Sequence, residues 1–249
     1  MIPALLIGRE GSAGFPGKNL LNVLGRPLCE YPILAANRAP SVDMVYVSTD
    51  SDQIKKISER SNCRIIERPA ELASKEALGE DAYVHGYQVI RKELEKEGKN
   101  IEMVVLLMCN APTINETLIE EGIAKLRADP NADSAVTVSA YNMWSPIRAL
   151  RMNTKGSLDS FVPYNLIEHL DTVNAVRNQK DNVFFADMGV SIVRPSCLEN
   201  IEQGILPQKW MGKNILPIYN WGGLDVDFPS QIGMIEFWLR ENGVKYRDS

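Results

Sequence analysis

Residues 2–7 read Ile-Pro-Ala-Leu-Leu-Ile, and residues 8–19 follow directly as Gly-Arg-Glu-Gly-Ser-Ala-Gly-Phe-Pro-Gly-Lys-Asn. The apolar run predicts a buried strand, and the glycine-rich run predicts a loop at its carboxyl end. Glycine lets backbone N–H groups approach a phosphate, and Arg9 and Lys18 supply positive charge. A loop at the carboxyl end of a parallel strand is a common ligand site. The stretch therefore favours an α/β protein with an anion site, and a plain glycine-rich turn is the alternative.

The glycine loop matches neither of two common phosphate-binding motifs. A P-loop ending at Lys18 requires glycine at position 12, where the chain has Ser12, and requires Ser or Thr where Asn19 stands. The dinucleotide fingerprint requires a Gly-x-Gly, and the four glycines of this loop are each three residues apart. Any anion bound here is held by a different arrangement.

Strand and helix patterns alternate along most of the chain. Helical spacing connects Tyr83, Tyr87, Ile90 and Leu94, and a capping-box pattern at 113–116 predicts the start of a helix that carries Ile119, Ile123 and Leu126. A last helix is predicted over 229–242. Apolar runs predict strands at 44–48, 64–66, 102–108, 134–139, 183–193 and 215–219. This alternation predicts a mostly parallel, doubly wound sheet.

Length and composition fit one α/β domain over residues 1–249. The chain is 45% hydrophobic and 24% charged, which is ordinary for a soluble globular protein. Its net charge of −5 argues against a nucleic-acid-binding protein, whose binding face would be basic. No apolar run is long enough for a membrane helix, and the start lacks the features of a signal peptide. We expect a cytoplasmic protein with reduced thiols at its cysteines, which are Cys29, Cys63, Cys109 and Cys197.

The pattern changes at about residue 141. Residues 141–186 mix proline, asparagine, aspartate and aromatic residues without a long helix, and short strands are predicted at 147–152 and 158–162. We interpret 141–186 as a small inserted arm that serves oligomerisation.

Two carboxylates follow a glycine pair near the carboxyl end. In Trp-Gly-Gly-Leu-Asp-Val-Asp, which is 221–227, Asp225 and Asp227 are two residues apart. In an extended segment both side chains project from one face. Two hard oxygen ligands on one face can hold Mg²⁺, with phosphate and water completing the octahedron. A polar edge strand at the surface is the alternative, because paired acids are usually solvated.

The sequence Arg9-x-Gly-Ser-x-Gly-x-Pro-x-Lys-Asn19 with Gly25-Arg-Pro-Leu28 resembles the opening motif of the acylneuraminate cytidylyltransferase family. These enzymes are related to the CMP-Kdo synthetases. Three further blocks agree with the family in order: Val47-Ser-Thr-Asp50, Arg68-Pro-Ala-Glu-Leu-Ala73 and Leu224-Asp-Val-Asp227. The resemblance covers most of the chain, and the first block is the most specific.

The resemblance implies a three-layer nucleotidyltransferase sandwich that works as a homodimer, with the small inserted arm of 141–186 serving dimerisation and the acceptor site. It implies transfer of a cytidylyl group from CTP to a sialic-acid-like (nonulosonic) sugar acid, with release of pyrophosphate and with Mg²⁺ held by Asp225 and Asp227. Arg9, Lys18 and the two aspartates would be catalytic. The implied nucleotide-binding residues are Arg9, Gly11, Ser12, Lys18, Asn19 and Arg68. Taken alone, Arg68 would be read as a solvated surface arginine.

The acceptor side departs from the family pattern. The resemblance implies that Asn110, Arg177 and Gln179 meet the sugar acid, and a bidentate arginine suits a carboxylate. Residues differ from the family at Ala13, Lys75, 108–114 and Met188. Two alternatives therefore stay open: a CMP-Kdo-type or other sugar nucleotidyltransferase with another acceptor or nucleotide, and a nucleotide-binding member without catalysis.

Overall fold

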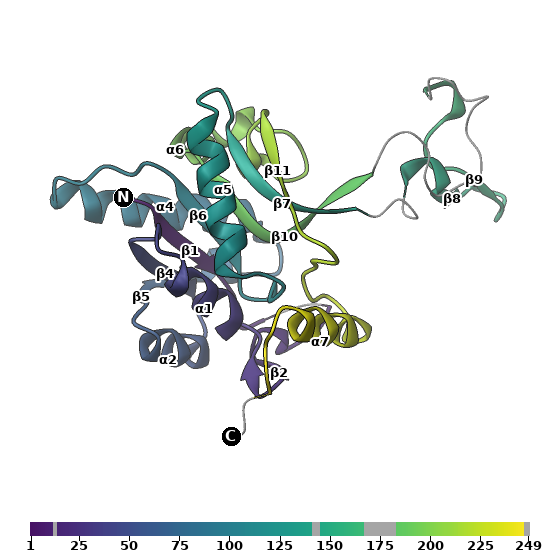
Figure 1. Cartoon of the computed structure of the whole chain (residues 1–249). Helices are drawn as coiled ribbons and strands as arrows, with labels where there is room; N and C mark the ends of the chain where they lie inside the picture. Colours follow the sequence, from purple (N-terminus) through teal and green to yellow (C-terminus); the bar gives the residue numbers. More distant parts are fainter. Residues whose placement is uncertain (12–13, 141–144, 167–182, 247–249) are drawn as a thin grey trace.

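The structure is a computed structural model that describes residues 1–11, 14–140, 145–166 and 183–246. Seven strands form its central sheet in the spatial order β11-β7-β10-β6-β1-β4-β5 (Figure 1). Neighbouring strands are parallel except where β10 pairs with β6 and β7. The mostly parallel sheet predicted from the sequence is confirmed. Its strands are β1 (Pro3–Ile7), β4 (Met44–Thr49), β5 (Arg64–Glu67), β6 (Val104–Met108), β7 (Ser134–Ala140), β10 (Phe184–Val193) and β11 (Ile215–Tyr219).

Side chains of one strand divide between two apolar cores, which makes the fold three-layered. Ala4 and Leu6 of β1 face α1, α2 and α5, whereas Leu5 and Ile7 face α4 and α6. Because alternate residues of a strand point to opposite faces, a continuously apolar strand must be covered on both sides. The helices are α1 (Glu30–Arg38), α2 (Asp52–Arg60), α3 (Ala70–Ala73), α4 (Gly79–Lys96), α5 (Glu116–Ala128), α6 (Pro195–Glu199) and α7 (Ile232–Glu241).

The predicted helical faces are confirmed, but one predicted helix start is wrong. The four apolar residues predicted for α4 and the three for α5 are all buried. Helix α5 begins after Asn115, whose side chain accepts a hydrogen bond from the Leu118 N–H at 3.0 Å. The Thr113 hydroxyl instead bonds to the backbone of Leu224. Thr113 therefore forms a tertiary contact with Leu224 and does not cap the helix as the capping-box spacing had predicted.

The end of β1 meets the end of β6 at a site that only glycine can fill. A Cβ atom on Gly8 would lie 2.5 Å from the Cys109 Sγ, far inside van der Waals contact. Backbone bonds join the same segments, from the Cys109 N–H to the Ile7 carbonyl at 3.0 Å and from the Gly8 N–H to the Ser48 carbonyl at 3.2 Å. This close approach brings the residues that follow β1, β4 and β6 together at one edge of the sheet.

A two-stranded hairpin lies within the predicted arm. It pairs β8 (Leu150–Met152) with β9 (Leu158–Ser160), and Figure 1 shows it apart from the central sheet. Both strands are shorter than predicted, and a 3-10 helix over Pro146–Arg148 occupies part of the range predicted as strand. Within the part of the chain that the structure describes, no helix has both the length and the apolar character needed to cross a bilayer.

Candidate functional site

A cleft of about 260 Å³ opens where β1 and β6 end, beside the residue that follows β5. Parallel strands present their carboxyl ends at the same edge of the sheet, so loops far apart in sequence meet there. Seven of the polar residues predicted from the sequence line this cleft: Arg9, Lys18, Asn19, Arg68, Asn110, Asp225 and Asp227.

The glycine loop reaches the acidic segment across the cleft. Gly17 has a φ of +73°, a left-handed conformation that favours glycine, and it leads into a 3-10 helix over Lys18–Leu20. The Lys18 Nζ lies 2.6 Å from the Asp227 Oδ1. A Cβ atom on Gly14 would lie 3.6 Å from the Asp227 carbonyl oxygen. Residues near the two ends of the chain therefore form one site, although 209 positions separate Lys18 from Asp227.

Asn19 and Arg9 are held against each other at the base of the loop. The Asn19 side-chain amide donates to the Arg9 carbonyl at 2.9 Å, and the Arg9 guanidinium donates to the Ser74 carbonyl. The Asn19 Oδ1 is buried and has no hydrogen-bond partner within the described residues. A buried acceptor without a donor costs free energy, so this oxygen is suited to receive a hydrogen bond from a ligand. Gly11 is exposed on the same loop, and Ser12 lies outside the described residues.

Arg68 is a buried cation with no carboxylate within ion-pair distance among the described residues, although the charge of Asp50 acts on it. The residue is only 8% exposed. Its guanidinium donates to the Ser48 carbonyl at 2.5 Å and to the Ser48 hydroxyl at 3.3 Å. Burial lowers the pKa of Arg68 below its ordinary value. No ion pair joins it to a carboxylate in the described parts of the chain. Because a buried charge is costly unless it is paired, Arg68 indicates an anionic or strongly polar ligand, and the reading as a surface arginine is wrong.

Side-chain and backbone bonds hold the two aspartates at the mouth of the cleft. The Asn110 amide donates to the Asp225 Oδ2 at 3.1 Å, and the Val226 N–H donates to the Asn110 carbonyl at 2.8 Å. The Asp227 N–H donates to the Gln231 side chain at 2.6 Å. Burial, and next the charge of Asp227, raise the pKa of the Asp225 carboxyl, whereas Lys18 and Asn110 oppose that rise.

The acidic pair has the chemistry of a divalent cation site. A raised carboxyl pKa means that the negative charge of Asp225 is poorly compensated, and a bound cation would compensate it. Asp227 has a side chain that is 55% exposed and can turn toward an ion. Among the residues described, no cluster of three or more His, Cys, Asp or Glu could hold a metal. Two carboxylates fit an ion that takes its remaining oxygen ligands from phosphate and water, as Mg²⁺ does.

Comparison with known proteins gives the family of the chain. The sequence profile of a family described as cytidylyltransferase matches residues 3–155, which is more than half of the chain. The chain belongs to the cytidylyltransferase family. The matched segment contains the glycine loop, Arg68 and Asn110, whereas the acidic pair lies beyond it.

Individual relatives extend the family match. An N-acylneuraminate cytidylyltransferase of Oncorhynchus mykiss is 23% identical over 230 residues, which are 92% of this chain and 49% of that protein. An N-acylneuraminate cytidylyltransferase of Escherichia coli O18:K1:H7 is 29% identical over 59% of this chain and 33% of its own length. An 8-amino-3,8-dideoxy-manno-octulosonate cytidylyltransferase of Shewanella baltica is 28% identical over 55% of this chain and 52% of its own length. The chain thus spans about half or less of the length of these relatives.

Solved structures share the fold over nearly the whole chain. A CMP:2-keto-3-deoxy-manno-octonic acid synthetase complexed with CTP aligns with a TM-score of 0.66 at 18% identity, covering 97% of this chain and 99% of that one. A 4-diphosphocytidyl-2C-methyl-D-erythritol synthase from Anaerococcus prevotii aligns with a TM-score of 0.63 at 14% identity, covering 96% of each. The predicted nucleotidyltransferase sandwich is confirmed by these alignments.

A second cavity adjoins the cleft of this cytidylyltransferase-family chain at Asp225. It has a volume of about 330 Å³, and Asp225 lines both it and the cleft. Its other lining residues are Phe185, Ala186, Asp187, Gly223, Leu224, Gln231 and Met234. Sequence reasoning assigned none of these to the site, because five of them are apolar or glycine residues and because no motif marks Asp187 or Gln231. The predicted acceptor residues Arg177 and Gln179 lie outside the described residues.

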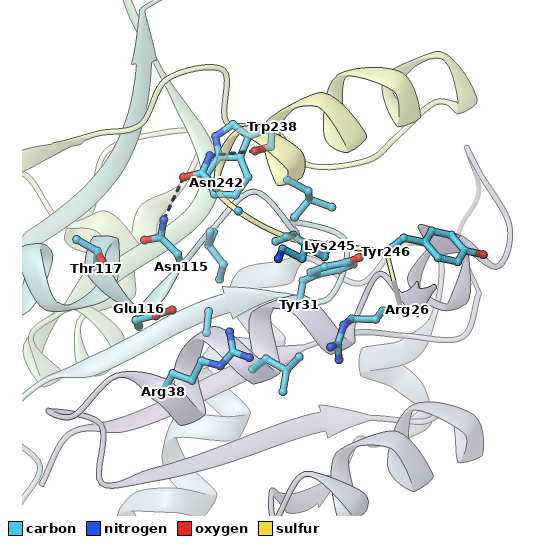
Figure 2. Close-up of a pocket in the computed structure, with 16 residues that line it drawn as sticks. Arg26, Tyr31, Arg38, Asn115, Glu116, Thr117, Trp238, Asn242, Lys245 and Tyr246 are labelled. Carbon is cyan, nitrogen blue, oxygen red and sulfur yellow. Dashed lines mark hydrogen bonds between the residues drawn. The ribbon is translucent and has the colours of Figure 1, made fainter. Parts of the chain in front are cut away.

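A cavity larger than the cleft lies elsewhere, and none of the predicted site residues line it. It has a volume of about 580 Å³ and lies between α1, the start of α5 and the end of α7 (Figure 2). Figure 2 shows Asn115 and Asn242 joined by a hydrogen bond, with Asn242 also bonded to the Trp238 carbonyl. The family-matching motifs and the buried Arg68 guanidinium lie at the smaller cleft, so residue chemistry rather than size makes the cleft the candidate functional site.

Proposed function

We propose that the chain transfers a cytidylyl group from CTP to a sialic-acid-like sugar acid and releases pyrophosphate. The observation that carries this proposal is the convergence of three cations, Arg9, Lys18 and Arg68, with the Asp225–Asp227 pair in one cleft. Cations without enough carboxylate partners suit a polyphosphate, and paired carboxylates beside them suit its divalent ion.

The reaction needs alignment and charge neutralisation more than covalent work by the protein. A hydroxyl oxygen of the sugar acid attacks the α-phosphorus of CTP, the bond to pyrophosphate breaks, and the hydroxyl proton is lost to solvent or a nearby oxygen. Lys18 and Arg9 would neutralise phosphate oxygens, which stabilises the charge that builds up on them. Asn19 and Arg68 would hold the nucleoside, with the unpartnered Asn19 Oδ1 accepting from a ribose hydroxyl or the cytosine amino group.

Asp225 and Asp227 would hold Mg²⁺ in this proposal. When bound, the ion would polarise phosphate oxygens and neutralise the pyrophosphate leaving group. Asn110 would keep the Asp225 carboxylate turned toward the cleft through its 3.1 Å hydrogen bond. Lys18 would exchange its present partner Asp227 for a phosphate oxygen when CTP binds.

The cavity that adjoins the cleft is the natural place for the acceptor. Because Asp225 lines both cavities, a sugar hydroxyl in the second would lie beside a phosphate in the first. Phe185 and Met234 give the second cavity apolar walls, which suit an acyl or deoxy portion of a nonulosonic acid better than a fully hydroxylated sugar. Arg177 and Gln179 are retained as the proposed partners of the acceptor carboxylate.

The proposal is tested by measuring pyrophosphate release from CTP with a panel of nonulosonic and octulosonic acids in the presence of Mg²⁺. We expect release with CTP and a nonulosonic acid, and none with ATP, GTP or UTP. Release only with an octulosonic acid would favour the CMP-Kdo-type alternative. Calorimetric binding of CTP without release for any acid would favour the non-catalytic alternative.

A cytoplasmic homodimer completes the proposal. The hairpin arm exposes a group of apolar side chains to solvent, which is unfavourable. We propose that a second copy of the chain buries them. These side chains are Leu150, Met152, Leu158, Phe161, Tyr164 and Leu166, each more than half exposed. Light scattering should give twice the chain mass of 27.8 kDa, and Met152→Asp with Leu158→Asp should return the protein to the monomer. A monomeric wild type would contradict the proposed dimer.

A further inference from the structure

Asp187 is a buried carboxylate at an irregularity in β10. The register of β10 against β7 shifts between Ala186 and Ser191, and Met188 within it has a left-handed φ of 61°. Asp187 is only 5% exposed. Its Oδ1 accepts hydrogen bonds from the Gly189 N–H at 3.0 Å and from the Thr137 hydroxyl. The bulge therefore turns a carboxylate inward from a strand that has no other charged residue.

The other oxygen of Asp187 faces the segment that carries the acidic pair. The Asn220 amide donates to the Asp187 Oδ2 at 2.9 Å, and the Ser139 hydroxyl lies 3.2 Å from the same oxygen. The Ser139 oxygen in turn accepts from the Gly223 N–H at 3.0 Å. A Cβ atom on Gly223 would lie 2.1 Å from the Asp187 Oδ2, so the backbone of this segment rests directly on the carboxylate.

Asn220 extends the network to two further elements. Its amide also donates to the Thr113 carbonyl at 3.0 Å, and its Oδ1 accepts from the Trp238 indole of α7 at 3.2 Å. The Thr113 hydroxyl bonds both backbone groups of Leu224, at 2.9 and 3.0 Å. Residues 220–224 are thus fixed by side chains from β7, β10, α7 and the segment before α5.

We propose that Asp187 is a positioning residue that fixes the backbone of 220–224 and thereby presents Asp225 and Asp227 as one metal-binding pair. This inference rests on the proposed function, because it assigns a support to the metal ligands of that site. A carboxylate is suited to this task because one group accepts hydrogen bonds from Thr137, Gly189 and Asn220, which belong to three parts of the chain. The Ser139 hydroxyl lies beside the carboxylate and also contacts the Asn220 carbonyl. Burying the carboxylate costs solvation, which raises the pKa of Asp187, and the hydrogen bonds that it accepts oppose that rise.

Asp187→Asn tests the proposal with Mn²⁺ as the probe. Electron paramagnetic resonance of free Mn²⁺ should show an affinity for the CTP-loaded protein that is about tenfold weaker in the variant, in the range that residues supporting metal ligands usually give. The CTP affinity without metal should stay unchanged, because Arg9, Lys18, Asn19 and Arg68 do not contact Asp187. A general loss of structure would lower both affinities.

Asp133→Asn is the matched control. Asp133 lies at the opposite end of β7 and accepts bonds from the Lys213 and Asn214 N–H groups at 2.7 and 2.9 Å. The control should lower the thermal midpoint without changing Mn²⁺ affinity. If Asp187→Asn does not fold, Ser139→Ala is the second variant. It removes the hydroxyl that accepts from the Gly223 N–H, and it should also weaken Mn²⁺ binding.

The outcomes separate the inference from the proposed function. Wild-type protein that binds no Mn²⁺ in the presence of CTP would remove the metal site and the inference together. Wild-type binding that Asp187→Asn and Ser139→Ala leave unaltered would remove the inference alone. An equal loss in Asp133→Asn would also overturn it, because the effect would then follow from stability rather than from position.

Discussion

Asp225→Asn is expected to lower turnover by about 100-fold or more without lowering the thermal midpoint of the protein. The substitution keeps the shape of the side chain and an oxygen that can accept the hydrogen bond from Asn110. It removes the negative charge that would bind the ion. Because loss of a charge-stabilising group acts on the transition state, kcat should fall more than the KM for CTP rises. Steady-state pyrophosphate release measures both.

The stability half of this prediction follows from the sign of the pKa shift. Burial and Asp227 raise the pKa of Asp225 in the folded state, so the folded protein binds a proton more readily than the unfolded chain does. The stabilisation by that proton is fully present below the unfolded pKa and is lost as pH rises through the folded value. At neutral pH the ionised Asp225 therefore costs stability, and an uncharged asparagine avoids that cost. Differential scanning calorimetry at neutral pH should give an equal or higher midpoint.

The same shift predicts the acid limb of the activity profile. Activity should fall as the Asp225 carboxyl becomes protonated and the ion is lost, and the raised pKa of the metal-free carboxyl favours that protonation. Higher Mg²⁺ should move the limb to lower pH, because the ion competes with the proton for the carboxylate. Asp43→Asn is the control, since Asp43 accepts a 2.6 Å bond from the Ile2 N–H at the other edge of the sheet. Full activity in Asp225→Asn, or a limb that Mg²⁺ does not move, would contradict the metal assignment.

The parts of this site that could be predicted from sequence are those in which one short segment carries the chemistry. The strand of 2–7 and the loop after it are such a segment, because apolar pattern, glycine and cation all occur within it. The pair Asp225 and Asp227 is another, since the two-residue spacing places both on one face. Neither segment indicates by itself that the two lie together in the fold. Their proximity follows from the order of the strands in the sheet.

The parts that could not be predicted depend on tertiary contacts. Thr113 has the spacing of a helix cap, but Leu224 forms its hydrogen bonds. Arg68 belongs to a residue type that is usually exposed, and only the fold around Ser48 buries it. Asp187 sits in an apolar strand, where one acid looks incidental until the bulge turns it inward. In each case the deciding partner is far away in sequence, so no local pattern indicates it.

Lys18→Ala is expected to weaken CTP binding by about ten- to a hundredfold, because a hydrogen bond to a charged group contributes roughly 1.5–3 kcal/mol. Binding of Mn²⁺ alone should change in the opposite direction and become up to about fivefold tighter. The Lys18 Nζ lies 2.6 Å from the Asp227 Oδ1, so in the free protein the lysine occupies a carboxylate that the ion would use. An ion pair with one half-exposed partner, here Asp227, is worth about 1 kcal/mol, which limits the gain. Calorimetry with CTP and with Mn²⁺ measures the two effects separately.

The opposite signs make this prediction specific to exchange of partners. Lys55→Ala is the matched control, since Lys55 is also a partly covered, ion-paired lysine, with Glu67 at 2.8 Å, but does not line the cleft. It should leave both affinities unchanged. An unchanged CTP affinity in Lys18→Ala would remove Lys18 from the site. Weaker binding of both ligands would mean that the glycine loop needs the ion pair for its shape, and that Asp227 does not pass from lysine to metal when the nucleotide arrives.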